Sequence, residues 1–142
     1  MTTTNKTNAK VFEFINDEIL AGKGDLVLPG SEELSGVIKR YVEGGENKLH
    51  NHPAEDHTFY ILQGMADFRI ESDDNIFRAG KFEAVFLPKG TSYWFHSAGD
   101  EKLIMLRVGT ETGSDRIIDG PLVKSHRTGD TAQHAPAREL DF

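Results

Sequence analysis

The amino-acid sequence predicts an all-β domain, a barrel or sandwich built from short strands. From residue 37 onward, β-branched and aromatic residues gather in runs of strand length, and glycine-, proline- or aspartate-containing turn signals separate the runs. Helical signals are poor over the same region. Short strands with turns at this spacing are typical of closed all-β architectures. The expected strands are Val37–Glu43, Thr58–Gln63, Ala66–Glu71, Phe82–Leu87, Ser92–His96 and Lys102–Val108.

Length and composition limit the possible functions. The 142 residues suffice for one domain with a hydrophobic core, but not for two ordinary ones. The formal net charge is −7 and the basic residues are scattered, which argues against a nucleic-acid partner. No apolar run has the length of a membrane span and no signal-peptide pattern is present, so we expect no membrane partner and a cytoplasmic location. Because cysteine is absent, a bound metal ion would need nitrogen and oxygen ligands.

The composition divides the chain into three parts. Residues 1–10 are rich in Thr, Asn and Lys, and we expect them to be disordered. Residues 11–109 should form the barrel, with one short helix over Ile15–Ala21 behind a possible Asn16 cap. Residues 110–142 are polar and should pack as an extension on the barrel or on a partner subunit. His126 and His134 in this extension are interpreted as surface residues.

Three histidines within eight positions form the most informative cluster. His50 and His52 are two residues apart, so on a strand they point to the same face, about 7 Å apart along the backbone. A turn at Pro53 would let the next strand deliver His57 to the same place. Imidazole nitrogens are common transition-metal ligands, so we predict a divalent metal site at these three histidines. A hydrogen-bonded polar patch is the alternative.

This segment resembles the first motif of the cupin superfamily, in which a glycine precedes His-x-His and a further glycine follows. Gly44, His50, His52 and Gly64 match the spacing of that motif. A second motif, over residues 80–97, is similar as well, with Pro88-x-Gly90 followed by the strand Tyr93-Trp94-Phe95. The resemblance covers roughly residues 37 to 108 and implies a cupin-type double-stranded β-helix, or jelly-roll, barrel.

Two positions depart from the family pattern. Where cupins have a glutamate ligand this sequence has His57, with Glu55 and Asp56 just upstream. Where cupins have a fourth, histidine ligand it has Tyr93. The resemblance therefore implies a site of three histidines with open positions. Glu55 and Asp56 in the loop beside it could be ligands or partners that orient an imidazole, but we interpret them first as solvated loop charges. His96 lies three residues beyond Tyr93 and so points to the opposite face.

The resemblance also implies a cofactor and a role for Tyr93. Cupins with three histidines and no glutamate include dioxygenases, so Fe(II) is favoured, while Zn, Ni and Mn stay open. Tyr93 would point inward near the metal as a candidate catalytic residue, acting as a ligand, a hydrogen-bond donor or a general acid–base. It would otherwise fill the mouth of the barrel.

An apolar pocket would favour a small substrate that chelates the metal through oxygen. Arg69 or Arg107 could anchor a carboxylate if it faces inward, although strand arginines more often face solvent. Small cupins commonly bury a dimer interface outside the barrel, where Trp94 and His96 are expected, so the resemblance implies a homodimer. The residues expected to line the pocket are Phe59, Ile61, Phe86, Phe95 and Met105.

These features lead to three hypotheses about function. The first is a metal-dependent enzyme acting on a small oxygen-chelating organic substrate, most naturally a dioxygenase-type oxidoreductase. The second is a lyase, isomerase or cyclase that uses the metal as a Lewis acid without redox chemistry. The third is a non-enzymatic domain that binds a small molecule. Fold analogy does not choose among them, because function depends on the site.

Overall fold

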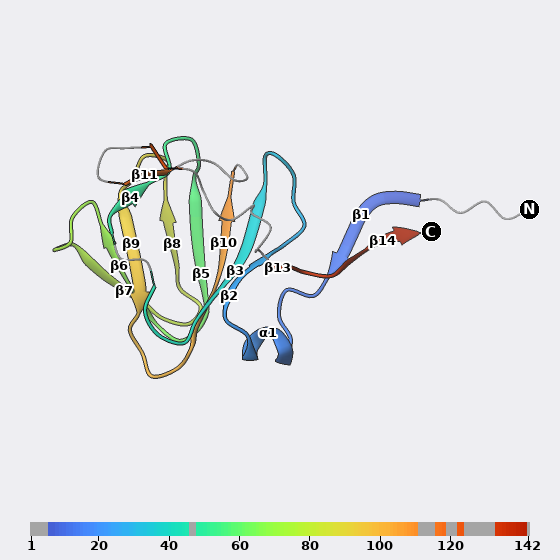
Figure 1. Cartoon of the computed structure of the whole chain (residues 1–142), viewed down its shortest axis with the longest axis horizontal. Helices are drawn as coiled ribbons and strands as arrows, with labels where there is room; N and C mark the ends of the chain where they lie inside the picture. The colour runs from blue at the N-terminus through green and yellow to red at the C-terminus, as the bar shows by residue number, and fades with distance from the viewer. Residues whose placement is uncertain (1–5, 46–47, 111–115, 119–121, 124–132, 142) are drawn as a thin grey trace, which may run out of the picture.

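The computed structural model describes residues 6–45, 48–110, 116–118, 122–123 and 133–141. Within these ranges the chain forms one short helix and two six-stranded sheets that face each other, plus a separate pair of strands (Figure 1). Strands that neighbour each other in a sheet are mostly far apart in the sequence. This arrangement confirms the predicted all-β jelly roll, although strand pairing does not join the two sheets in the described part of the chain. The one helix described there is not long and apolar enough to cross a membrane.

The first sheet carries most of the core. Its neighbours are antiparallel, except that its edge strand β13 pairs with β2 in parallel. In order across the sheet, its strands are β13 (Gln133–His134), β2 (Gly24–Val27), β3 (Ser35–Tyr41), β10 (Leu103–Gly109), β5 (His57–Gln63) and β8 (Ala84–Leu87).

The second sheet lies opposite and is antiparallel throughout. Strand β4 is only two residues long, but its pairing with β9 and β11 fixes the chain just before the histidine-containing turn. In order, the strands are β12 (Leu122–Val123), β11 (Arg116–Ile118), β4 (His50–Asn51), β9 (Tyr93–Ser97), β6 (Ala66–Ile70) and β7 (Ile76–Ala79).

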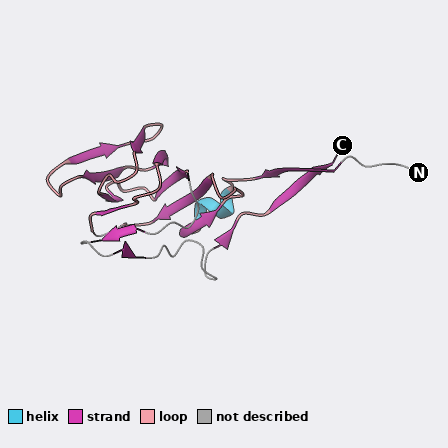
Figure 2. Cartoon of the chain, turned by 90° about the horizontal axis from the view of Figure 1, so that it is seen from above, coloured by secondary structure: helices cyan, strands magenta, loops and turns pink. Residues whose placement is uncertain are grey.

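A third, two-stranded sheet projects away from the body of the protein (Figures 1 and 2). It consists of β1 (Lys6–Phe12) and β14 (Ala137–Asp141), and we call it the arm. The prediction of disorder over residues 1–10 is therefore wrong for residues 6–10, because they pair with the far end of the chain. Residues 1–5 lie outside the described ranges.

Helix α1 (Asp17–Ala21) joins the arm to β2 and matches the predicted helix to within two residues. The Asn16 side chain caps it, accepting a hydrogen bond of 2.8 Å from the amide of Ile19. Arg40 from β3 then holds its last turn by donating to the carbonyl of Ile19.

Strand alternation separates two apolar clusters. Along β5, Phe59 and Ile61 point between the sheets, while Tyr60 points outward and is 44% exposed. The interior cluster is fully buried and consists of Phe59, Ile61, Ala66, Phe68, Ala79, Val85, Leu87, Tyr93, Phe95, Leu103 and Met105. The second cluster lies on the outer face of the first sheet, under α1, and its buried members are Ile19, Leu26, Ile38, Ile104 and Ala135.

Candidate metal centre

The three predicted histidines lie together at one end of the interior. Strand β4 places His50 directly opposite Tyr93 of β9, the turn at Pro53 follows, and His57 opens β5. All three rings are buried, at 3%, 7% and 2% exposure in chain order. The ring centroids of His50 and His52 are 5.3 Å apart, and those of His52 and His57 are 4.3 Å apart.

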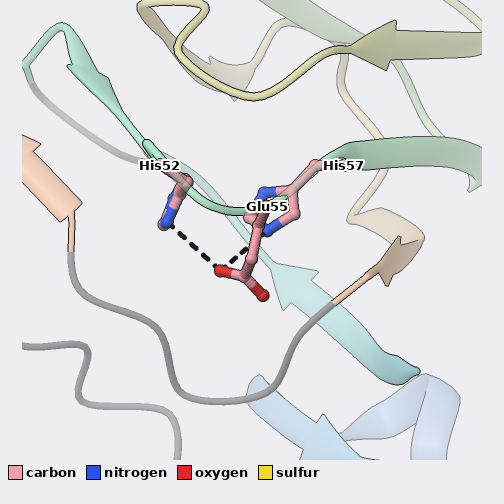
Figure 3. Close-up of side chains that lie close together, drawn as sticks. All are labelled: His52, Glu55 and His57. Atoms are coloured by element: carbon pink, nitrogen blue, oxygen red, sulfur yellow. Dashed lines mark ion pairs between the residues drawn. The ribbon is translucent and has the colours of Figure 1, made fainter. Parts of the chain in front are cut away.

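Glu55 joins this cluster, so its interpretation as a solvated loop charge is wrong, and the alternatives of a ligand or an orienting partner remain. It is 1% exposed, and its Oε2 lies 3.3 Å from Nε2 of His57 and 3.5 Å from Nδ1 of His52 (Figure 3). One ligand atom from each of His52, Glu55 and His57 falls within 4.8 Å of the others. The neighbouring Asp56 instead supports the loop, where its carboxylate accepts a hydrogen bond from the amide of Lys89.

His50 stands beside this group rather than in it. Among the described residues, the set whose ligand atoms all lie within 4.8 Å of one another contains His52, Glu55 and His57 but not His50. Nδ1 of His50 lies 3.1 Å from the carbonyl oxygen of Lys48, and its ring packs 4.6 Å from that of Tyr93. Ligation by His50 thus stays a prediction.

His57 has a polar partner at each nitrogen. Its Nδ1 lies 3.1 Å from the hydroxyl of Tyr93, and its Nε2 lies 3.1 Å from Nη1 of Arg107. Gly109 makes room for this ring, because a Cβ there would meet Cδ2 of His57 at 3.0 Å and Oγ of Ser35 at 2.9 Å. Tyr93, 2% exposed, points inward as predicted, next to the cluster.

Arg107 brings a second charge into the site. It is 1% exposed, and besides the contact to His57 its Nη2 donates to Oγ of Ser35 at 3.2 Å. Its buried Nε meets no hydrogen-bond acceptor among the described residues. The expectation that strand arginines face solvent is therefore wrong here, since Arg107 shares the inward face of β10 with Met105, two residues before it.

Arg69 shows the opposite placement. It lies on the outer face of β6, with its guanidinium carbon 4.3 Å from the centroid of the Trp94 ring and its Nη1 3.0 Å from Nδ1 of His96. Trp94 and His96 are half-buried there, on the face opposite Tyr93, as expected. His134 is exposed on β13, and His126 lies outside the described residues.

The predicted lining residues divide into two groups. Phe59, Ile61, Phe95 and Met105 are at most 1% exposed and pack against one another in the interior cluster. Phe86 is 61% exposed, because Val85 and Leu87 on either side of it point inward. Its assignment to the lining is thus wrong, a consequence of choosing the wrong phase of the strand alternation.

The donor set fits a divalent transition metal. Two imidazoles and one carboxylate, all buried and converging, form the type of triad that leaves coordination positions open and is typical of non-haem Fe(II) sites. A buried carboxylate also requires nearby positive charge. The residues present thus fit such an ion, which His52, Glu55 and His57 would hold.

The family model described as "Cupin domain" matches residues 37–109, slightly more than half of the chain. This protein belongs to the cupin family. The family match and the double-stranded β-helix neighbours described next agree with the jelly-roll topology of the two sheets. The search of curated proteins gave no match for the sequence.

Solved structures of similar fold include three of different kinds. The cupin domain of Schizosaccharomyces pombe Cnp3 superposes with a TM-score of 0.56 at 19% identity, over 61% of this chain and 63% of that one. A double-stranded β-helix protein from Klebsiella pneumoniae superposes with a TM-score of 0.58 at 15% sequence identity, over 67% of this chain and 84% of that one. Oxalate decarboxylase from Bacillus subtilis, which has Mn(II) centres, superposes with a TM-score of 0.54 at 18% sequence identity, over 63% of this chain and 24% of that one. This cupin thus spans less than two thirds of the Cnp3 and oxalate decarboxylase chains, and at these identities the likeness concerns the fold alone.

Proposed function

We propose that this cupin is a metal-dependent enzyme acting on a small, oxygen-chelating carboxylate, with dioxygenase-type chemistry as the favoured reaction. The observation that carries the proposal is the buried convergence of His52, Glu55 and His57 beside the buried guanidinium of Arg107. A bound Fe(II) or another divalent metal would supply Lewis acidity and open positions for substrate and dioxygen. The chain's own residues set the charge, the orientation and the access of that site.

The participation of Glu55 changes the charge expected at the metal. Three neutral imidazoles would leave a divalent cation fully positive, whereas one carboxylate among the ligands reduces the site's charge by one. Glu55 would also favour a harder cation such as Fe(II) or Mn(II) over a purely nitrogen-ligated one. This supports keeping Fe(II) as the favoured metal, with Mn, Zn and Ni as alternatives.

Tyr93 would act first on the tautomer of His57. If Nδ1–H of His57 donates to the Tyr93 hydroxyl, 3.1 Å away, the lone pair of the ring remains on Nε2, on the side of Glu55. The tautomer is thereby set for metal ligation. The same hydroxyl sits at the edge of the cluster, where it can hold or return a proton during turnover.

Arg107 would select the substrate's charge. Nε2 of His57 has a single lone pair, so it can face the Arg107 donor or a metal ion, but not both. A metal bound at His57 would release Nη1 of Arg107, whose Nε already has no acceptor among the described residues. The guanidinium then offers N–H donors at Nη1 and at Nε, two different edges of the group, to the oxygens of an anionic substrate such as a carboxylate.

The packing of the interior limits the size of the substrate. In the described part of the chain, the space beyond the histidines is filled by Phe59, Phe68 and Phe95, whose rings lie within 5.5 Å of one another. Only the polar end is left for a ligand. We therefore expect a compact dicarbonyl, catechol-like or 2-oxo carboxylate compound rather than a large aromatic substrate.

Metal analysis of protein purified without a metal-binding tag tests the proposal. We expect close to one iron per chain after anaerobic loading with Fe(II), loss of that iron in His52→Ala, and full retention in His134→Ala, which changes an exposed histidine. Oxygen uptake with a panel of small carboxylates should follow the iron content. Absence of any metal after loading with Fe, Mn, Zn and Ni would overturn the proposal.

Arg107→Leu separates substrate recognition from metal binding. Removing the Arg107 guanidinium should leave the affinity for the metal unchanged or raise it, because a positive charge next to the metal site is lost. The KM for a carboxylate substrate should rise at least tenfold. If Arg107→Leu binds metal and turns over carboxylates like the wild type, the role given to Arg107 is wrong.

A non-redox Lewis-acid reaction is the second candidate. Oxalate decarboxylase, which shares the fold, has Mn(II) centres, and the same three residues would serve a lyase, isomerase or cyclase with Tyr93 as proton donor. Turnover of a small carboxylate with Mn(II), without oxygen uptake, would favour it over the dioxygenase.

A further inference from the structure

A hollow lies at the base of the arm, between the arm, α1 and β2. It has a volume of about 710 Å³, within the range of about 300–1,000 Å³ that small-molecule sites occupy. Phe12 and Ala137 line it from the arm, and Ile19 and Leu26 line it from the apolar cluster on the outer face of the first sheet. The hollow is thus separate from the candidate metal centre, which lies between the two sheets.

A buried cation reaches this hollow from β3. Arg40 is one of the lining residues, yet it is only 4% exposed, so its guanidinium lies at the inner side of the hollow. Gly22, directly after α1, makes this position possible, because a Cβ there would overlap with Nη1 of Arg40. The place of the guanidinium therefore depends on the absence of a side chain at residue 22.

The protein uses only part of the hydrogen-bonding capacity of Arg40. Its Nε donates to the carbonyl of Gly24 at 3.1 Å, its Nη1 to the carbonyl of Ile19 at 3.3 Å, and its Nη2 to the side chain of Gln133 at 2.9 Å. Since each terminal nitrogen carries two N–H groups, Nη1 and Nη2 each keep one without an acceptor among the described residues. A buried donor without an acceptor costs free energy, so an acceptor supplied by a ligand would be stabilising.

The charges near Arg40 favour an anion as that ligand. Asp25 attracts Arg40, but its carboxylate is also paired with Lys39 at 3.3 Å. Lys102 adds a further positive charge, with its Nζ donating to the carbonyl of Leu20 at the end of α1 at 2.7 Å. Three cations thus share one carboxylate, which leaves a surplus of positive charge on this side of the sheet.

The titration of these cations agrees with that surplus. Burial lowers the pKa of Arg40, and the charge of Asp25 offsets part of the effect. Burial also lowers the pKa of Lys102, and the charge of Arg40 lowers it further. The other charged residues that line the hollow are exposed, so solvent screens them; they are Glu13, Glu18, Lys23 and Arg138.

We propose that this hollow is a second ligand site, which binds a small amphipathic carboxylate such as a medium-chain fatty acid. The carboxylate would accept hydrogen bonds from Arg40, and the apolar body would lie between the arm and the outer face of the first sheet. A single buried guanidinium suits a singly charged head group, because the charge-assisted hydrogen bonds then come without an unbalanced second charge.

NMR titration of the full chain with octanoate tests this site. We expect the backbone amide signals of Gly22, Leu26 and Ala137 to shift until they saturate, while those of His57 and Phe59 stay in place. Octanol has the same apolar chain without the charge, and it should bind at least about tenfold more weakly because the charge-assisted hydrogen bonds are lost.

A filled hollow gives the steric test. Ala137→Trp places a large side chain in the hollow from an exposed position on the arm, so affinity for octanoate should fall at least about tenfold. The matched control is Glu139→Trp, which changes another exposed residue of the same strand outside the hollow and should bind octanoate like the wild type.

Two further variants test the role of the guanidinium. Arg40→Met removes its charge, and Gly22→Ala keeps the charge but displaces it, so each should weaken octanoate binding at least about tenfold. Circular dichroism checks that both variants fold, and Gly22→Ala decides the matter if Arg40→Met does not. His52→Ala removes a candidate metal ligand and should leave octanoate binding unchanged, which keeps this site distinct from the metal centre.

Absence of amide shifts around the hollow with octanoate up to about 5 mM would overturn the proposal. This is also the result expected if a second copy of the chain fills the hollow. Equal affinity for octanoate and octanol would overturn it as well, and so would octanoate binding that Ala137→Trp leaves unchanged.

Discussion

The two ends of the interior between the sheets are built from the same strands but have opposite characters. On β5, His57 and Phe59 are two residues apart and share a face; one belongs to the polar cluster and the other to the aromatic core. On β10, Arg107 and Met105 repeat the pattern. The layer of side chains that contains His57 and Arg107 is polar, and the next layer, which contains Phe59 and Met105, is apolar and excludes water.

Because of this difference, one end of the interior serves mainly the stability of the fold and the other serves the candidate metal site. The apolar end contributes burial and packing, and therefore most of the folding free energy. The polar end has desolvated Glu55 and Arg107, which are costly without partners of opposite charge. Changes at the two ends should therefore have different signatures, in unfolding for one and in metal binding for the other.

The largest effect should come from Phe59→Ala at the apolar end. Phe59 is 0% exposed and packs against Phe68, Tyr93 and Phe95, so truncation leaves a cavity and should cost about 3–5 kcal/mol of unfolding free energy. Urea unfolding measures this. Phe77→Ala, at a 46% exposed position on β7, is the control, and equal losses in the two variants would contradict the division.

Glu55→Gln should act at the polar end alone. The amide keeps the shape of Glu55 but removes its charge, so affinity for a divalent metal should fall by about 100-fold. Calorimetric titration with Mn(II) or Zn(II) measures the change. Asp56→Asn, in the adjacent loop position, is the control and should bind metal like the wild type. Unchanged metal affinity in Glu55→Gln would remove Glu55 from the ligand set.

Tyr93→Phe should sharpen the boundary between the two ends, because Tyr93 belongs to both. Its ring is part of the interior cluster and its hydroxyl contacts His57, so losing the hydroxyl should cost only about 0.5–1.5 kcal/mol of stability. Metal affinity should fall several-fold as the His57 tautomer loses its partner. A fall in stability as large as that of Phe59→Ala would mean that the hydroxyl is part of the core rather than of the site.

The smallest effect is expected for an ion pair outside the interior. The pKa of Asp67 is lowered, mainly by its hydrogen bonds with Arg78, at 2.8 and 3.0 Å, on the outer face of the second sheet. A lowered pKa stabilises the fold at pH values above the ordinary pKa of about 4, and this contribution is lost as pH falls through the lowered value.

Asp67→Asn should therefore lower the melting temperature by less than about 3 °C at pH 7. Between pH 5 and pH 2, the melting temperature of the variant should fall less than that of the wild type. Thermal unfolding followed by circular dichroism over that range is the measurement. If the melting temperature of the variant falls with pH as steeply as that of the wild type, Asp67 has no part in the acid sensitivity.

The sequence by itself determined the architecture and the place of the site. Each of the six expected strands, Val37–Glu43 among them, overlaps a strand of the structure, because alternating apolar residues and intervening turns act locally. The spacing of His50, His52 and His57 also brought these histidines together, since two lie on one strand face and a turn returns the third. The resemblance implied that Tyr93 points inward near the histidines, and its ring is buried opposite His50.

The tertiary structure decided which neighbouring residues complete the site. Glu55 lies in the loop before β5, where no strand alternation gives its direction, and its burial beside His52 and His57 is seen only in the folded chain. Arg107 meets His57 across 50 positions of sequence, and only the pairing of β10 with β5 brings them together. Phe86 and the arm were missed for the same reason: the period of a strand is local, but which face is inward and which segments pair depend on distant parts of the chain.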